Sequence, residues 1–148
     1  MSYLKGSEWR KWDLHVHTPF SYLNTQFGND FDEYVRQLFK KAIEKNIAAI
    51  GITDYFTIEG YKKLKQDYLE NEEKLKELFT EDEIEKIKQI LILPNIEFRL
   101  NKLVGSKRIN YHVIFSNELP IEDIEDNFLR EIKFIYEGAP QTEDEKSH

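Results

Sequence analysis

The chain has 148 residues, 40% of them hydrophobic and 14% aromatic, and its net charge at pH 7 is −7. This length supports one substantial core, and the absence of cysteine excludes disulfides, thiolate metal sites and thiol nucleophiles. The acidic balance argues against a broad basic surface for nucleic acid, and no apolar run approaches the roughly 20 residues that cross a bilayer. We expect a cytoplasmic globular protein without a membrane partner, whose available metal ligands are His, Asp and Glu.

The first predicted element is a strand at the start of "WDLHVHTPFS", residues 12–21. Side chains alternate along a strand, so His15 and His17 point to the same face as Asp13, while Trp12 lies on the apolar face. Two imidazoles placed in this way suit a metal ion. We expect both tryptophans of the chain to pack in the core rather than to stack on bases.

A helix and a buried strand follow. Asp30 is a candidate N-cap, and apolar residues recur at helical spacing through residue 43. The nearly continuous apolar run "IAAIGITDY", residues 47–55, is typical of a strand covered on both faces. The order strand, helix, strand predicts a parallel α/β sheet, with Asp54 at a strand end. Alone, that carboxylate could equally be a helix cap or a turn residue.

The second half of the chain continues the pattern. A long helix is predicted over about residues 58–78, with Asn71 interrupting it, and Thr80 with Glu83 forms a possible capping box for a short second helix. The buried strand "ILILPNIEF" ends near Glu97, and a turn-like "NKLVGSKR" precedes a strand in "INYHVIFS" that carries His112. A last amphipathic helix precedes a polar acidic tail, residues 138–148.

These strands bring four potential ligands toward one edge of the predicted sheet: His15, His17, Glu97 and His112. A glutamate can bridge two cations, and paired cations suit phosphoester hydrolysis by an activated water. Each signal alone is weak, because a histidine on an apolar strand is more often structural than a ligand. Their order in the chain makes the combination more specific.

The motifs "DLHVHTPFS", "AAIGITDY", "LPNIEF" and "NYHVIF" together resemble the opening motifs of the polymerase and histidinol phosphatase (PHP) family. The resemblance implies a distorted β/α barrel whose metal cluster hydrolyses phosphate esters. It implies that His15 and His17 bind one ion, that Glu97 bridges it to a second, and that His112 binds the second. We predict that these four residues form the catalytic centre, with Asp13 and Asp54 supporting the ligands.

The chain departs from the family pattern in two ways. Tyr55 stands where the second motif usually has a histidine, and Leu23 occupies a position that is often a ligand. The late family ligands are absent, so the sequence resembles the front part of a PHP domain, residues 1–137, with an incomplete barrel. We predict that Tyr55 and Arg99 contact substrate, since hydroxyl and guanidinium groups bind phosphate oxygens.

The leading hypothesis is a metal-dependent phosphoesterase or nuclease that acts on phosphodiesters of nucleic acid, with one or two divalent ions (zinc, manganese, iron or magnesium). The alternative is a noncatalytic PHP-derived scaffold or regulatory module. The resemblance includes PHP modules that precede an ATPase domain in bacterial proteins of DNA metabolism or defence, so such an ATPase is an expected partner. An amidohydrolase-like barrel ranks third, because its later ligands are not found. Unpaired barrel edges make self-association a further expectation.

Overall fold

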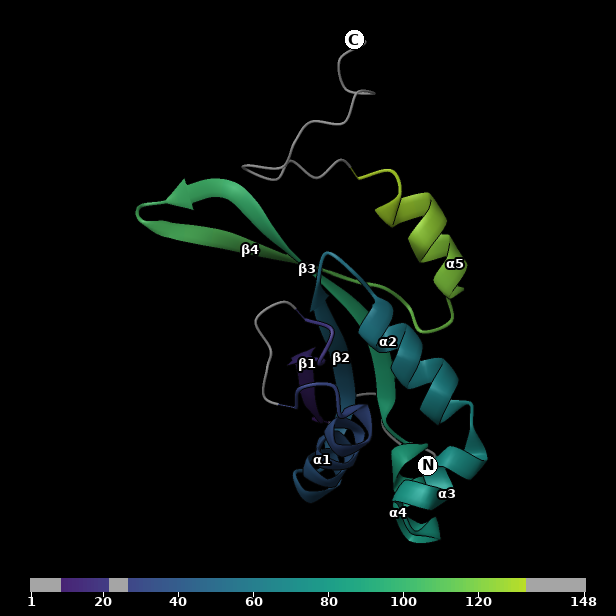
Figure 1. Ribbon diagram of the computed structural model, residues 1–148. Helices are drawn as coiled ribbons and strands as arrows, with labels where there is room; N and C mark the ends of the chain where they lie inside the picture. Colours follow the sequence, from purple (N-terminus) through teal and green to yellow (C-terminus); the bar gives the residue numbers. More distant parts are fainter. Residues whose placement is uncertain (1–8, 22–26, 133–148) are drawn as a thin grey trace.

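The computed structural model describes residues 9–21 and 27–132, and it shows a mixed α/β fold in which a four-stranded sheet curls into a half-barrel (Figure 1). The predicted α/β class is confirmed at this level. In spatial order, which is also chain order, the strands are β1 (Lys11–His17), β2 (Ile47–Tyr55), β3 (Leu91–Val104) and β4 (Lys107–Ile114).

The sheet is mixed in direction. Strands β1, β2 and β3 run parallel, as predicted, but β4 runs antiparallel to β3. The prediction of a wholly parallel sheet was therefore wrong. Gly105 has a φ of 63°, a left-handed conformation that suits glycine in a tight turn, and it closes a hairpin between β3 and β4. Most of the supposed turn "NKLVGSKR" consequently belongs to the two strands.

Helix α1 (Phe31–Glu44) crosses between β1 and β2 and begins as predicted at Asp30. The Asp30 side chain accepts a hydrogen bond from the backbone N–H of Glu33, which satisfies one of the free donors of the first turn. The apolar stripe of this helix enters the core through Phe31, Tyr34, Val35, Phe39 and Ala42.

The predicted long helix over residues 58–78 is divided in the structure. It consists of α2 (Glu59–Lys63), the wider π-helical segment η1 (Leu64–Leu69) and α3 (Glu72–Leu78). Asn71 does interrupt it: its side chain caps α3 by accepting from the Lys74 N–H. An asparagine favours such a cap over a helix interior because its short side chain bonds the nearby backbone.

Helix α4 (Glu81–Ile87) confirms the capping box. Thr80 accepts from the Glu83 N–H, and the Glu83 carboxylate accepts from the Thr80 N–H. The chain then enters β3, and after β4 it forms α5 (Ile121–Ile124) and the π-helical η2 (Glu125–Leu129). The rest of the predicted last helix and the acidic tail lie outside the described residues. None of the described helices is long and apolar enough to cross a bilayer.

Strand β1 lies at an edge of the sheet and contains an irregularity that shapes the site. Its pairing with β2 shifts between Asp13 and Val16, so the strand bulges beside Gly51. A Cβ atom on Gly51 would lie 2.3 Å from the Leu14 carbonyl oxygen, which only glycine permits. The absence of a side chain at Gly51 therefore allows β1 to approach β2 closely at the residues that precede His15.

The prediction that both tryptophans pack in the core was wrong. Trp9 is fully exposed and Trp12 is 63% exposed. Trp12 lies near the start of β1, an edge strand among the described strands. The core is supplied instead by the helices and by the inner strands, for example Phe39, Ile52 and Ile96.

We predict that Gly51→Ala destabilises the protein by about 1–3 kcal/mol, because the added methyl group would force β1 away from β2. Urea unfolding followed by circular dichroism would measure the change. Ala48→Ser, at a half-buried position on the same strand, serves as the control. An unchanged unfolding midpoint for Gly51→Ala would contradict the close approach of these strands.

Candidate metal centre

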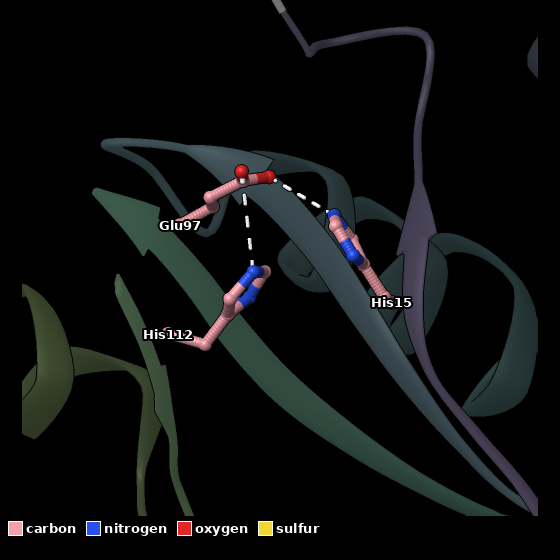
Figure 2. Close-up of side chains that lie close together, drawn as sticks. All are labelled: His15, Glu97 and His112. Carbon is pink, nitrogen blue, oxygen red and sulfur yellow. Dashed lines mark hydrogen bonds and ion pairs between the residues drawn. The ribbon is translucent and has the colours of Figure 1, made fainter. Parts of the chain in front are cut away.

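Three imidazoles from two strands converge on one carboxylate, that of Glu97 on β3. The Nε2 atoms of His15 and His17 lie 3.0 and 3.1 Å from Glu97 Oε2, and His112 Nε2 on β4 lies 3.9 Å from Oε1. Figure 2 shows the carboxylate between His15 and His112, one oxygen toward each ring. The structure thus brings together all four predicted ligands.

Glu97 is completely buried, while the side chain of His15 is half exposed. The carboxylate therefore forms the floor of the site, and the imidazoles form walls that solvent reaches. Asn110, on the neighbouring strand β4, also donates a hydrogen bond to Glu97 Oε1. His112 and Glu97 are directly paired across the antiparallel ladder, which places their side chains on the same face of the sheet.

The outer nitrogen of His17 has a polar partner that orients the ring. His17 Nδ1 lies 2.7 Å from Ser21 Oγ, and Ser21 in turn hydrogen-bonds the buried carboxylate of Asp54. Because an ionised carboxylate only accepts, the Ser21 hydroxyl donates to Asp54 and its oxygen accepts from His17 Nδ1–H. We therefore assign the proton of neutral His17 to Nδ1, which leaves a lone pair on Nε2 toward Glu97.

His112 is held in the same way. The Asn95 amide donates to the Leu14 carbonyl oxygen at 2.7 Å and to Thr53 Oγ1 at 2.9 Å. Its Oδ1 is consequently the acceptor for His112 Nδ1–H, at 3.3 Å. The Nε2 lone pair of His112 then also faces Glu97.

With these tautomers, the Nε2 lone pairs of His17 and His112 both face oxygen atoms of the Glu97 carboxylate. His15 Nε2 is also 3.0 Å from His17 Nε2. Such a cluster of acceptors is repulsive unless a cation, either a proton or a metal ion, lies among them. Donors that bind one zinc ion at about 2.0–2.2 Å are separated from each other by roughly 3–3.5 Å. The spacing of His15, His17 and Glu97 Oε2, at 3.0–3.1 Å, fits one such ion, whereas His112 Nε2 is 3.9 Å from the other carboxylate oxygen.

The electrostatic environment keeps two of the rings, those of His17 and His112, available as ligands at neutral pH. Desolvation by burial lowers the pKa of His17 below its ordinary range, although the Glu97 carboxylate opposes that effect. Desolvation also lowers the pKa of His112, assisted by the charge of His15. Both imidazoles are therefore neutral at pH 7, the form that binds metal. The His15, Glu97 and His112 group could hold a metal ion, with its ligand atoms within 4.8 Å of one another.

The two residues predicted to contact substrate lie beside this group and touch each other. The Tyr55 ring packs 4.9 Å from the His17 ring, and its hydroxyl oxygen accepts a hydrogen bond from Arg99 at 2.9 Å. The guanidinium of Arg99 also lies 4.6 Å from the Tyr55 ring centre. Tyr55 thus stacks next to the site, with its hydroxyl turned to Arg99.

Of the two aspartates predicted to support the ligands, Asp54 is connected to a ligand side chain and Asp13 contacts only the backbone of one. Asp54 supports the site through the end of β1, because it accepts from the backbone N–H and the hydroxyl of Thr18 and reaches His17 through Ser21. Asp13 instead accepts from the backbone N–H of His15 at 3.4 Å, so it contacts that residue's backbone and not its imidazole. Leu23 lies outside the described residues.

Sequence reasoning missed the polar residues that orient the ligands, namely Ser21, Asn95 and Asn110. The spacing could have indicated two of them, because Asn95 lies two residues before Glu97 and Asn110 two before His112. Each asparagine therefore shares a strand face with a predicted ligand, and it bonds the ligand on the other strand. Ser21 follows His17 by four residues in a non-helical segment, where spacing predicts nothing.

Comparisons with protein-family models, with curated proteins and with solved structures gave no match to this chain.

We predict a pH dependence of stability from Asp54. Burial raises the pKa of Asp54 from 3.8 to about 6, although hydrogen bonds from Thr18 oppose the shift. A raised carboxyl pKa means that the folded state binds the proton more tightly. The stability that the protonated Asp54 carboxyl gives to the folded state is therefore complete below pH 3.8, and it is lost as the pH rises to about 6.

The expected loss across this interval is at most about 3 kcal/mol, given 1.36 kcal/mol per pKa unit. It would be measured as the difference in unfolding free energy between the wild type and Asp54→Asn, in EDTA, from pH 4 to 7. Asp67→Asn, at an exposed position, is the control. A difference that stays constant with pH would refute the raised pKa.

A second prediction concerns metal affinity. Replacing Glu97 by glutamine removes the charge that faces all three imidazoles, so Glu97→Gln should weaken binding of Zn²⁺ or Mn²⁺ at least about 100-fold. Isothermal titration calorimetry at pH 7 measures this, with Glu118→Gln, an exposed glutamate, as the matched control. Equal affinities of the two variants would show that the cluster is not the metal site.

Proposed function

We propose that the protein is a metal-dependent phosphoesterase module related to the PHP family. The observation that carries this proposal is the buried Glu97 carboxylate, which turns one oxygen to His15 and His17 and the other to His112. This arrangement offers separate donor sets to two ions that share one carboxylate.

The ordered motifs of the sequence support the same conclusion. His15 and His17 come from the first motif, Glu97 from the third and His112 from the fourth, and these distant segments meet in one cluster. The curled sheet is compatible with part of a barrel. The free edges of β1 and β4 among the described strands would be paired by further strands in a complete barrel, or by a second copy of the chain.

Divalent ions bound here would activate a water for attack on phosphorus and stabilise the charge on the phosphate oxygens. The residues of the chain hold and orient the ligands. Ser21 and Asn95 fix the tautomers of His17 and His112, and the floor formed by Glu97 excludes water from one side of the site. Arg99 lies exposed beside the site, where its guanidinium suits phosphate oxygens. No covalent nucleophile is needed.

A second candidate function is a noncatalytic scaffold that retains one ion, as in a regulatory module linked to an ATPase. Tyr55 favours it, because a phenol replaces the usual histidine of the second motif and its hydroxyl already bonds Arg99. A protonated phenol is a poor substitute for an imidazole as a ligand near neutral pH. A scaffold of this kind would bind metal without turnover.

Hydrolysis of bis(p-nitrophenyl) phosphate, a generic phosphodiester, separates the two functions. With Mn²⁺ or Zn²⁺ added, we expect turnover that falls at least about 100-fold in His15→Ala and in Glu97→Gln, because each change removes a ligand. Glu118→Gln should keep wild-type activity. Absence of turnover in metal-loaded wild type would favour the scaffold, and equal turnover in all variants would exclude this site as the catalyst.

A further inference from the structure

Strands β3 and β4 continue past the metal centre as a two-stranded arm that projects from the rest of the molecule (Figure 1). We define the arm as residues 99–110, with its tip at Gly105 and Ser106. Its base is the pair Glu97 and His112, so the metal centre lies where the arm joins the body.

The charge of the arm is opposite to that of the whole protein. No acidic residue occurs between Glu97 and Glu118, whereas the net charge of the chain is −7. The arm carries four cations by sequence: Arg99, Lys102, Lys107 and Arg108. A segment of uniform positive sign on an acidic protein attracts polyanions locally and repels them elsewhere.

The cations on one face of the arm align with the metal ligands. Because side chains alternate along β4, Arg108, Asn110 and His112 belong to the same face of that strand. The pairing of β4 with β3 is irregular between Arg99 and Leu103. On β3, Arg99 follows Glu97 by two residues and is paired with Asn110. At about 3.3 Å per residue, Arg108 lies roughly 13 Å along the strand from His112. That span equals several nucleotides of a stacked strand, which rises about 3.4 Å per nucleotide.

The cations at the tip are free to accept a ligand. Lys107 and Arg108 are exposed, and neither forms an ion pair with any described residue. Several lysines of the helices, by contrast, are paired with carboxylates, for example Lys62 with Glu125 and Lys74 with Asp32. Within the described part of the chain, the two cations at the tip therefore offer positive charge that no carboxylate pairs.

Flat side chains at the base of the arm add a second type of contact. The rings of His17 and Tyr55 and the guanidinium of Arg99 form a stack, with 4.9 Å between the rings and 4.6 Å from guanidinium to ring. Arg99 is its exposed end. A guanidinium or aromatic plane stacks most readily on the exposed face of an unpaired base, which favours a single strand over a duplex.

We propose that the arm is a binding element for single-stranded nucleic acid and that it leads the phosphodiester backbone to the metal centre. Arg108 contacts a phosphate on the face that carries the candidate ligands, and Lys107, on the other face beside the turn at Gly105, reaches the same strand around the tip of the hairpin. Arg99 contacts the nucleotide next to the site. The assignment of the bound strand as the substrate rests on the proposed function, whereas binding itself does not.

The test is fluorescence anisotropy of a labelled 20-nucleotide oligothymidylate, in EDTA so that no metal-dependent turnover occurs. We expect wild type to bind with an affinity that falls as salt rises. Lys107→Ala with Arg108→Ala should weaken binding about tenfold and reduce the slope against log salt by about 1.4, at about 0.7 per phosphate contact. The charge-matched control, Lys40→Ala with Lys86→Ala on α1 and α4, should bind as wild type does.

Three results would overturn the proposal: no binding by wild type at low salt, equal loss of affinity in the arm variant and the control, or tighter binding of a duplex of the same length. If gel filtration showed instead that the arm variant only abolishes self-association, the arm would be a protein interface. If the protein did not bind oligothymidylate but still hydrolysed bis(p-nitrophenyl) phosphate, the arm proposal would be wrong and the phosphoesterase proposal would be unaffected. Binding of the oligothymidylate without any hydrolysis of that ester would support the arm and count against the phosphoesterase.

Discussion

The burial of the Glu97 carboxylate is the constraint on which the rest of the structure depends. A carboxylate without solvent must be compensated by donors or cations. Here Asn110 on β4 donates a hydrogen bond to it, and the imidazoles of β1 and β4 surround the place where a cation would complete the compensation. The sheet must therefore curl enough to bring its first and last described strands toward the same side chain. Glu97 links the local geometry of the site to the overall shape of the half-barrel.

A shell of hydrogen-bonded polar groups maintains this convergence. Asn95 connects three strands, because it bonds the Leu14 carbonyl on β1, Thr53 on β2 and His112 on β4. Asp54 performs a similar task at the end of β1 through Thr18. Buried polar networks that are satisfied in this way define one arrangement of the strands, since any shift leaves a donor or acceptor without a partner. The same network sets the imidazole tautomers, so folding and ligand orientation are coupled.

The antiparallel strand β4 changes how the site is built. In a wholly parallel sheet, ligands gather where strands end, and a polyanion would approach only from that edge. Here His112 lies within a hairpin, and the same hairpin continues outward as the cationic arm. One supersecondary element thus supplies a ligand at its base and positive charge along its length. This gives an acidic protein a local concentration of positive charge, which the net charge alone would not suggest.

Local patterns in the sequence were sufficient for several of the elements and for the choice of candidate ligands. The buried run of β2, the Asp30 cap and the capping box at Thr80 depend on neighbouring residues, so reading along the chain predicts them. The interactions that sequence reasoning missed join residues far apart: Asn95 with Leu14, Ser21 with Asp54, and β4 with β3 in the antiparallel direction. Strand direction and cross-strand hydrogen bonds depend on which segments meet in space. Hydrophobic periodicity describes only which face of a segment is buried, so it does not predict those contacts. Residue order therefore determined which groups could act as ligands, whereas tertiary packing decided that they surround one buried carboxylate.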